Sequence, residues 1–454
     1  MSDAQLVFIG NNRLSNIFPD AGRIITVPTA APRDWLPDGT YALKTAAGYE
    51  FTLLLANDNK LFAVGRNEYG QLGRGHSNAN DRGVPRPVTG FGDKRVTQIA
   101  AGYRHCAAVT ERGHLFMWGY NSYGQCAPQV GNVLEATRCD SGALADVDVR
   151  VAFVACGRHH TVALRSDGVV IVFGYNNYGQ LGTGNNDSRQ LTPVRLTSAA
   201  LAGVRIVGCA AGSNFTQLVS DDGRVFAMGA NNDGQLGTGN TTDVNTPTEI
   251  DAAHFGDAPV AAVACGGKHA MAITRDEGKL YCWGKGATGA TGLGYTRDAM
   301  TPQRVVGALA DARVVRVAAG FMHSCTLTEQ GTVYAFGDCP SIPKEGRQGM
   351  PQPLQEGALA PGTTVSALST VSALSTGCHA MHAAFITGKP PTAPGDGRIP
   401  ENLGNDDVEG DDVEGGSNPN PNPNPNVKEM IAAIEKGITK SSATKSTATF
   451  TLKF

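Results

Sequence analysis

Three groups of residues have types and spacings that could support chemistry. CHAMH at residues 378–382 offers Cys378, His379 and His382 as metal ligands. GKGATG at residues 284–289 contains the G-x-G-x-x-G of dinucleotide sites. The third group is a set of histidines that each follow a glycine by three residues: His105, His160, His269 and His323. The elements that hold these residues decide whether any of them forms a site.

The metal and dinucleotide interpretations both fail on local context. Alternate side chains of a strand point to opposite faces, so Cys378 and His379 should diverge rather than converge on an ion. GKGATG stands where other copies of a repeated loop stand, and no βαβ pattern surrounds it. The chain also lacks a G-x-x-x-x-G-K-[ST] phosphate loop and an H-E-x-x-H motif. We therefore predict no catalytic residue, no metal and no cofactor.

Two linked phrases recur along the chain. The loop GYNNYGQLGTG at Gly174 returns, with wear, at five other glycines spaced by 53 to 55 residues: Gly65, Gly119, Gly229, Gly284 and Gly337. Upstream of each lies a corner phrase such as ACGRHHTVAL, whose glycines are Gly48, Gly102, Gly157, Gly212, Gly266, Gly320 and Gly377. Glycines in the loop permit positive φ and asparagines bond locally, so the loop is best interpreted as a structural corner.

Each repeat predicts four strands. One ends at the corner phrase, a second such as TVALRSDG follows, a tight turn at Asp167-Gly168 leads to a third, and a looser fourth begins near Thr192-Pro193. Four strands in about 50 residues is typical of a propeller blade. QLVFIGNN at residues 5–12 matches a third strand, which the last repeat lacks. We predict an all-β, seven-bladed propeller closed by this N-terminal strand.

The two phrases resemble the regulator of chromosome condensation repeat family, with its A-[AC]-G-x-x-H-[ST] corner and W/F-G-x-N-x-x-G-Q-L-G loop. The resemblance covers roughly residues 5–387 and implies a seven-bladed β-propeller. Family members serve as exchange factors for the GTPase Ran, as ubiquitin-ligase modules, as scaffolds or as a plant ultraviolet sensor. The sensors carry tryptophan just after the corner glycine. Here that place holds Tyr103, Arg158, Ser213, Gly267 and Phe321, which argues against photoreception.

The recurring histidines leave two alternatives open. Each could hydrogen-bond to backbone within its own blade, or the ring of histidines could border a partner-binding face, as the resemblance suggests. Phe51 and Phe215 take the same place in two repeats, so a hydrogen bond there is not required in every blade. Trp118 and Trp283 stand just before a loop glycine, at an apolar packing position.

Composition narrows the class of protein. Charged residues are 17% of the 454 and the formal net charge is −3. The part from Gly388 onward carries that −3, so the rest is neutral. A neutral body argues against nucleic acid as the main ligand, and charge does not support chromatin contact. No apolar run is long enough for a membrane span, and no secretory signal is visible. The 10 cysteines have no C-x-x-C pair, and Cys156, Cys209 and Cys265 look like buried free thiols. These features predict an intracellular protein, cytoplasmic or nuclear.

The predicted domains are a propeller over 1–387, an acidic and Asn-Pro-rich linker over 388–426, and a terminal segment over 427–454. VKEMIAAIEKGI in that segment has the apolar stripe of a short helix, and TATFTLKF alternates like a strand. A helix of about three turns is marginal alone in water. We expect it to dock on its own propeller or on a partner through Met430, Ile431, Ile434, Ile438, Phe450, Leu452 and Phe454.

Two functions from different classes follow. The first is a non-catalytic scaffold or adaptor that binds a protein partner. The second is a guanine-nucleotide exchange factor for Ran or a related small GTPase, which needs no active-site chemistry because it acts by favouring the nucleotide-free state. The even repeat interval leaves little room for the wedge that GTPase-acting members use, and the basic N-terminal arm of nuclear members is absent. Both departures favour the first function.

Overall fold

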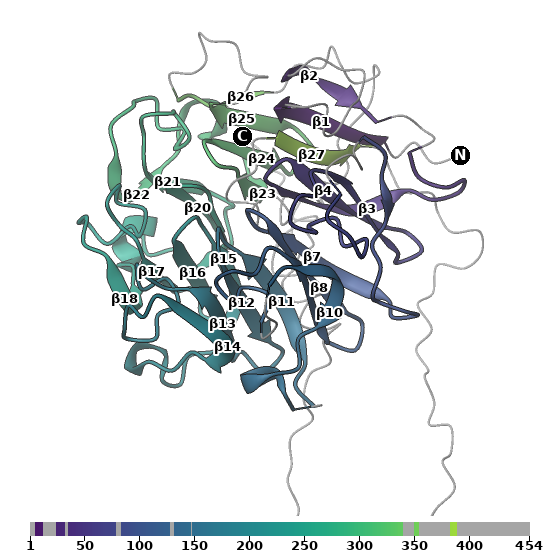
Figure 1. Cartoon of the computed structure of the whole chain (residues 1–454). Helices are drawn as coiled ribbons and strands as arrows, with labels where there is room; N and C mark the ends of the chain where they lie inside the picture. Colours follow the sequence, from purple (N-terminus) through teal and green to yellow (C-terminus); the bar gives the residue numbers. More distant parts are fainter. Residues whose placement is uncertain are drawn as a thin grey trace, which may run out of the picture.

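The computed structural model is an all-β propeller whose sheets are arranged around a central axis (Figure 1). The structure describes residues 5–11, 24–31, 35–78, 83–127, 131–146, 148–338, 349–353 and 382–387. The linker and terminal segment predicted beyond Thr387 lie outside these ranges, as do all seven residues expected to dock the tail. Their predicted structure therefore stays a prediction.

Six sheets have four strands each and are numbered here as blades 1 to 6. Blade 1 contains β3 (Ala42–Gly48), β4 (Phe51–Ala56), β5 (Leu61–Gly65) and β6 (Arg86–Pro87). Blade 2 contains β7 (Val96–Ala101), β8 (His105–Thr110), β9 (Leu115–Gly119) and β10 (Val133–Arg138). Blade 3 contains β11 (Val151–Cys156), β12 (His160–Arg165), β13 (Val170–Tyr175) and β14 (Arg189–Arg195).

The second half of the ring repeats this order. Blade 4 contains β15 (Ile206–Ala211), β16 (Phe215–Ser220), β17 (Val225–Gly229) and β18 (Val244–Glu249). Blade 5 contains β19 (Val260–Cys265), β20 (His269–Thr274), β21 (Leu280–Gly284) and β22 (Ala299–Arg304). Blade 6 contains β23 (Val314–Ala319), β24 (His323–Thr328), β25 (Val333–Gly337) and β26 (Gln352–Pro353). Short 3₁₀ helices lie between consecutive blades: η2 (Gly142–Leu144), η3 (Ala199–Leu201), η4 (Ala252–Phe255) and η5 (Gly307–Leu309).

A seventh sheet closes the ring with strands from both ends of the propeller sequence. β1 (Gln5–Asn11) lies between β2 (Ile24–Ala30) and β27 (His382–Thr387). The pairing of Gly10 with His382 and of Gln5 with Thr387 confirms the closure predicted from QLVFIGNN. The prediction of seven blades holds only in part: six blades are complete, and this closing sheet has three described strands. The first strand expected near Gly377 lies outside the described residues.

Tight turns join the second and third strands of each blade, as predicted. In blade 3 the turn uses Gly168 with φ of 90°, and in blade 4 it uses Gly223 with φ of 92°. Added side chains there would be strained, which explains the Asp-Gly pairs. The fourth strands include the Thr-Pro pairs but begin two or three residues earlier; β14, for example, starts at Arg189 and contains Thr192 and Pro193.

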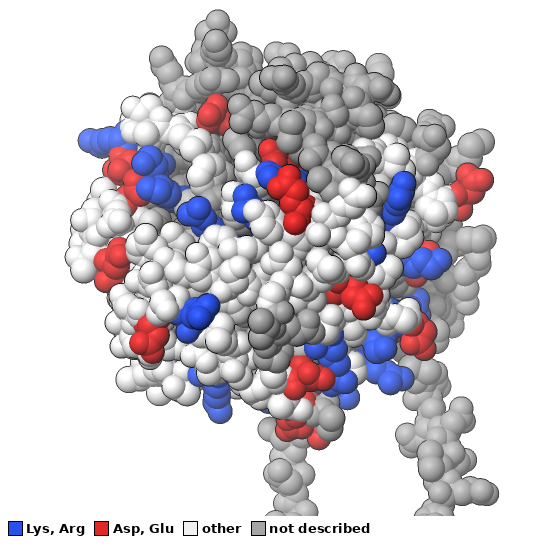
Figure 2. All heavy atoms as spheres, viewed as in Figure 1, with Lys and Arg blue, Asp and Glu red and all other residues white. Residues whose placement is uncertain are grey.

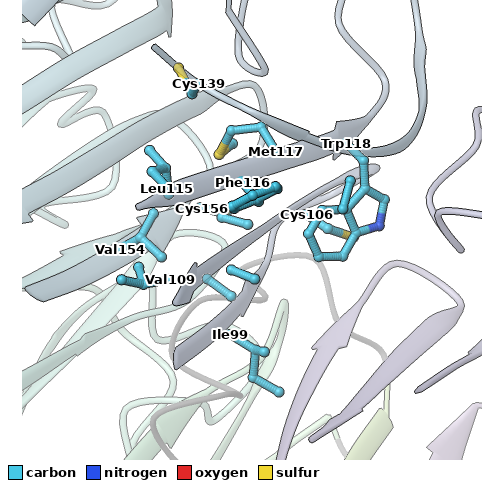
Figure 3. Packing of buried hydrophobic residues seen from close by; sticks show 14 of the residues in the cluster. Ile99, Cys106, Val109, Leu115, Phe116, Met117, Trp118, Cys139, Val154 and Cys156 are labelled. Atoms are coloured by element: carbon cyan, nitrogen blue, oxygen red, sulfur yellow. The ribbon is translucent and has the colours of Figure 1, made fainter. Parts of the chain in front are cut away.

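The core lies between blades rather than within one. A blade has two faces, and each packs against a neighbour, so the second and third strands are buried along their whole length. Figure 3 shows this for blade 2, where Phe116 and Trp118 of β9 pack among Cys106 of β8 and Val154 and Cys156 of β11 in blade 3. The eight cysteines in the described residues are free and buried, which confirms the prediction for Cys156, Cys209 and Cys265. Among the described residues, no helix is long and apolar enough to cross a membrane.

Candidate functional site: the corner face

The strand register divides the propeller into two ends. His160 opens β12 opposite Gly174, which lies near the end of β13, so the corner phrase and the Gly/Asn loop meet at one end. We call this end the corner face. The opposite end, which carries the tight turns between second and third strands, is the hairpin face. Adjacent corners touch around the axis: Tyr49 N donates to Tyr103 O at 3.3 Å and Arg158 N to Gly212 O at 3.3 Å.

Corner glycines are required by the ring that follows them. A Cβ on Gly157 would lie 2.1 Å from Cε1 of His160, and one on Gly212 would lie 2.0 Å from Cε1 of Phe215. The same overlap arises at Gly48, Gly102, Gly266 and Gly320. The aromatic ring three residues on therefore lies directly on its glycine, which is the physical origin of the A-[AC]-G-x-x-H phrase.

Three of the recurring histidines connect neighbouring blades. His160 donates through Nε2 to Oγ1 of Thr216 in blade 4 at 3.0 Å, and Thr216 donates to the Gln180 carbonyl at 2.8 Å. Since the hydroxyl proton is used on the carbonyl, the histidine must supply the proton of the first bond, which sets the Nε2–H tautomer. The same chain runs from His105 through Thr161 to Gln125 and from His269 through Ser324 to Ala290. We call this arrangement the histidine lock.

Phenylalanine at the same position comes with a different connection. After Phe51, the residue matching Thr216 is Cys106, and the Gln71 carbonyl accepts from Trp118 Nε1 at 3.0 Å. After Phe215, the matching residue is Ala270, and the Gln235 carbonyl accepts from Trp283 Nε1 at 3.1 Å. Both tryptophans are fully buried, as predicted, but the sequence did not reveal these hydrogen bonds. Tryptophan thus replaces the hydroxyl wherever phenylalanine replaces histidine; we call this the tryptophan lock.

The structure corrects the prediction for His105, His160, His269 and His323. Each is at most 3% exposed, so these side chains lie beneath the corner face and do not contact a partner themselves. Nor do their Nε2 atoms bond to backbone within the blade, because three reach a hydroxyl of the next blade instead. Burial holds the pKa of His105, His160 and His269 at about 3 and that of His323 at about 4. They are neutral at physiological pH, and the surface beside them becomes the candidate site.

The loop motif N-x-x-G-Q builds that surface. Asn176 Oδ1 accepts from Leu181 N at 3.0 Å, and Gln180 Oε1 accepts from Tyr178 N at 3.0 Å. The equivalent glutamines hold the backbone of Tyr69 and Tyr123. Asparagine and glutamine therefore close the loop from inside and leave the third residue after asparagine's glycine neighbour, often tyrosine, at the face. This confirms the structural interpretation of the loop.

Aromatic side chains form a continuous group over blades 1 to 3. We call it the aromatic arc; its members are Tyr49, Tyr69, Tyr103, Tyr120, Tyr123, His159, Tyr175 and Tyr178, all half-buried. Ring centroids are 4.7 Å apart for Tyr49 and Tyr103, 5.0 Å for Tyr123 and His159, and 4.9 Å for Tyr123 and Tyr175. Such edge-on and tilted ring contacts leave little side-chain freedom, so the surface is already ordered before any partner binds.

Arginines lie among these rings. Arg104 stands 4.5 Å from the ring centroids of both Tyr69 and Tyr103 and donates to both hydroxyls, at 3.0 and 3.2 Å. Arg158 is exposed and lies 5.6 Å from the Tyr103 ring. Arg66, by contrast, is neutralised by Glu50 at 2.9 Å and by Glu68. The positive charge of the arc is therefore concentrated on Arg104 and Arg158.

The corner face changes character in blades 4 and 5. Asp233, 8% exposed, accepts from Lys268 at 2.8 Å and Lys285 at 2.9 Å. Burial raises the pKa of Asp233, but the two ammonium groups outweigh it and leave the pKa below its usual value. This side of the face is polar and internally paired, while the arc side is aromatic.

The remaining sequence candidates do not join this site. GKGATG forms the loop after β21 and is followed by turns, as in the other blades. Cys378 and His379 lie outside the described residues, and His382 opens β27. Within the described ranges, no cluster of three or more histidine, cysteine or acidic residues could hold a metal. The arc itself was missed because its tyrosines stand in loops 50 to 60 residues apart and meet only when the ring closes.

Comparison with known proteins identifies the repeats. The family model described as the RCC1-like domain matches residues 22–310 and, in an overlapping second match, residues 142–421. The Ultraviolet-B receptor UVR8 of Arabidopsis thaliana is 33% identical over 301 residues, covering 66% of each chain. Human E3 ubiquitin-protein ligase HERC2 is 32% identical over 302 residues, covering 65% of this chain and 6% of HERC2. The crystal structure of human WBSCR16 superposes with a TM-score of 0.69 at 25% identity, covering 85% of this chain and 99% of that one.

Proposed function

Because this chain belongs to the RCC1-like domain family, we propose that it is a non-catalytic propeller that binds a protein partner as a scaffold or adaptor, through the aromatic arc. The relatives support this class: the chain spans about two thirds of UVR8 and a small fraction of HERC2, so the activities of those whole proteins are not transferred. An intracellular location, cytoplasmic or nuclear, is part of the proposal, and the buried free thiols support it.

The single observation that carries the proposal is the composition of the arc. Tyrosine and arginine are the side chains enriched at the energetic centres of protein interfaces, where rigid rings bury area at low entropic cost. Here seven tyrosines and a histidine surround Arg104 and Arg158 on one side of one face. We expect the partner to present apolar groups to the rings and at least one carboxylate to these guanidinium groups.

Substitution of the arc should remove partner binding without unfolding the blades. Arg104→Ala with Tyr123→Ala is expected to weaken capture of partners about 100-fold, because interface centres lose about 2 kcal/mol or more per truncated anchor. The measurement is affinity capture from cell extract followed by titration of the enriched protein. Asn214→Ala is the matched control, since Asn214 occupies in blade 4 the place of Arg104. Equal capture by the double variant and the control would refute the arc as the binding surface.

The alternative function is nucleotide exchange on Ran or a related small GTPase, which the family resemblance favours. It requires no catalytic group, only tighter binding of the nucleotide-free GTPase. The protein should then accelerate release of fluorescent GDP from Ran in proportion to its concentration, and Arg104→Ala should reduce that acceleration. A release rate that stays at the spontaneous value with saturating protein would eliminate exchange on Ran while leaving the scaffold proposal intact.

A further inference from the structure

The hairpin face of blade 2 carries a group of basic residues that the proposed function does not use. Lys94 lies in the turn before β7, Arg112 in the β8–β9 turn, Arg138 at the end of β10 and Arg150 just before β11. We call these four residues the basic patch. They come from three consecutive turns and one strand end, and the fold brings them together around His114. In the view of Figure 2, Lys and Arg side chains gather at the lower right edge of a molecule whose charges are otherwise mixed.

Contacts between the turns hold the patch together. Arg150 Nη1 donates to the Arg112 carbonyl at 3.0 Å, and Val151 N donates to the Gly113 carbonyl at 2.9 Å. Lys94 Nζ is 3.4 Å from the Phe91 carbonyl, which keeps this side chain at its own turn. Within the described part of the chain, none of the four basic side chains forms an ion pair.

His114 reports the resulting field. Burial lowers its pKa first, and Arg138, Arg112, Arg150 and Lys94 lower it further. Its Nδ1 is buried and has no hydrogen-bond partner among the described residues. Asp93, Glu111 and Asp148 stand in the same turns and offset part of the charge, but the balance is positive. A concentration of cations on an otherwise neutral body is a surface suited to a short, densely acidic segment.

The chain itself contains such a segment. Residues 406–414, DDVEGDDVE, hold six carboxylates and no basic residue. The register of β27 places Thr387 at the hairpin face: His382 pairs with Gly10 as His105 pairs with Gly119, so β27 runs from the corner face to the hairpin face. The chain therefore leaves the propeller at the end that carries the basic patch.

The connection is long enough. From the closing sheet, blade 1 and then blade 2 follow around the ring, so two sheet spacings of ~10 Å each separate the exit from the patch near the axis, and somewhat more at the periphery. The 18 residues between Thr387 and Asp406 span about 60 Å when extended, with a flexible-coil mean of about 25 Å. A tether of this length gives an effective concentration of about 1 mM, enough to populate a weak contact.

We propose that residues 406–414 bind the basic patch of blade 2 in the same molecule and thereby cover it against other polyanions. Charge complementarity, the shared face and the length of the connection support this occupant over a separate acidic protein, which would lack the tether. The contact is independent of the aromatic arc, because it lies at the opposite end of the propeller.

The test uses the full chain and a fluorescein-labelled peptide with the sequence of residues 404–415, followed by fluorescence anisotropy at about 50 mM salt, where exposed charges are weakly screened. A tail-neutral variant carries Asp406→Asn, Asp407→Asn, Glu409→Gln, Asp411→Asn, Asp412→Asn and Glu414→Gln. We expect the peptide to bind the tail-neutral chain at least tenfold more tightly than the unmodified chain, whose own segment competes. Adding Arg112→Gln and Arg150→Gln should weaken binding to the tail-neutral chain about tenfold or more, since each removed pair is worth up to about fivefold.

Matched controls remove the same charge elsewhere on the hairpin face. Arg165→Gln and Arg224→Gln alter arginines already paired with Asp167 at 2.7 Å and Asp222 at 2.8 Å, and should leave peptide binding unchanged. Equal peptide affinity for the unmodified and tail-neutral chains, or equal losses in patch and control variants, would overturn the proposal. So would a labelled DNA duplex that binds both chains equally well, because the patch would then be open and its occupant a nucleic acid.

Discussion

Replacing Thr216 with valine should lower the free energy of unfolding by about 3 kcal/mol, although the two side chains have nearly the same shape. The substitution leaves the Nε2–H of His160 and the carbonyl of Gln180 without their shared hydroxyl in a site that is 0% exposed. Each buried group stranded in this way costs about 1–3 kcal/mol. Urea unfolding at pH 7.5, followed by tryptophan fluorescence, measures the change.

The control for this prediction is Thr216→Ser, which keeps the hydroxyl and should cost about 1 kcal/mol for the lost methyl group. The sharper test converts the lock: His160→Phe, Thr216→Ala and Met228→Trp together reproduce the tryptophan lock, since Met228 occupies in blade 4 the place of Trp283 in blade 5. The triple variant should recover at least half of the stability that Thr216→Val loses. If Thr216→Val unfolds at the same urea concentration as the natural protein, the lock does not stabilise the junction.

The locks show why the sequence predicted the blades but not their junctions. The A-[AC]-G-x-x-H phrase repeats within each blade, and period and turn chemistry suffice to place its strands. The partner of His160 is Thr216, which lies 56 residues away in the following repeat. A signal existed: histidine in one repeat is followed by threonine or serine in the next, and phenylalanine by Cys106 or Ala270. Reading it required comparing each repeat with its successor rather than with a consensus.

The seventh repeat illustrates a different limit. Its phrase STGCHAMHAAFI suggested Gly377 as the corner glycine, which puts Ala380 at the position of the recurring histidine. The pairing of His382 with Gly10 matches that of His160 with Gly174, so the histidine position is two residues later. Only the pairing partner, at the other end of the propeller sequence, determines this register, because a shift by two preserves the alternation of side chains.

The aromatic arc could not be inferred from single repeats for a related reason. Tyr69, Tyr123 and Tyr178 each follow the asparagine of the loop by two residues, a position that no hydrophobic periodicity marks. Their significance appears only when three loops are placed side by side and Arg104 is found between two rings. The buried histidines, by contrast, drew attention because histidine is often functional, yet they support the face from beneath. Residue type indicated the correct end of the propeller and the wrong depth.

Lowering the pH from 7.5 to 5 should destabilise the propeller by about 8 kcal/mol, the largest effect we expect. Four buried histidines have a pKa of about 3 or 4 when folded and about 6.5 when unfolded. Between these values the unfolded chain takes up protons that the folded chain does not, so stability is full above pH 6.5 and falls as the pH drops toward 4 or 3. At pH 5 each histidine costs about 2 kcal/mol by this linkage. Because domains are stable by only about 5–15 kcal/mol, the protein should unfold near pH 5.

His323→Phe isolates one quarter of this effect. His323 is the histidine whose Nε2 lacks a hydrogen-bond partner among the described residues, and Phe51 and Phe215 already occupy the same position in other blades. The seventh repeat carries Ala383 where blade 5 carries Ala270, the residue that accompanies Phe215. The variant should therefore match the natural protein at pH 7.5 within about 1 kcal/mol and lose about 6 rather than 8 kcal/mol at pH 5. Urea titrations at pH 7.5, 6 and 5 give both slopes; identical slopes for the two proteins would show that the buried histidines do not control the acid sensitivity.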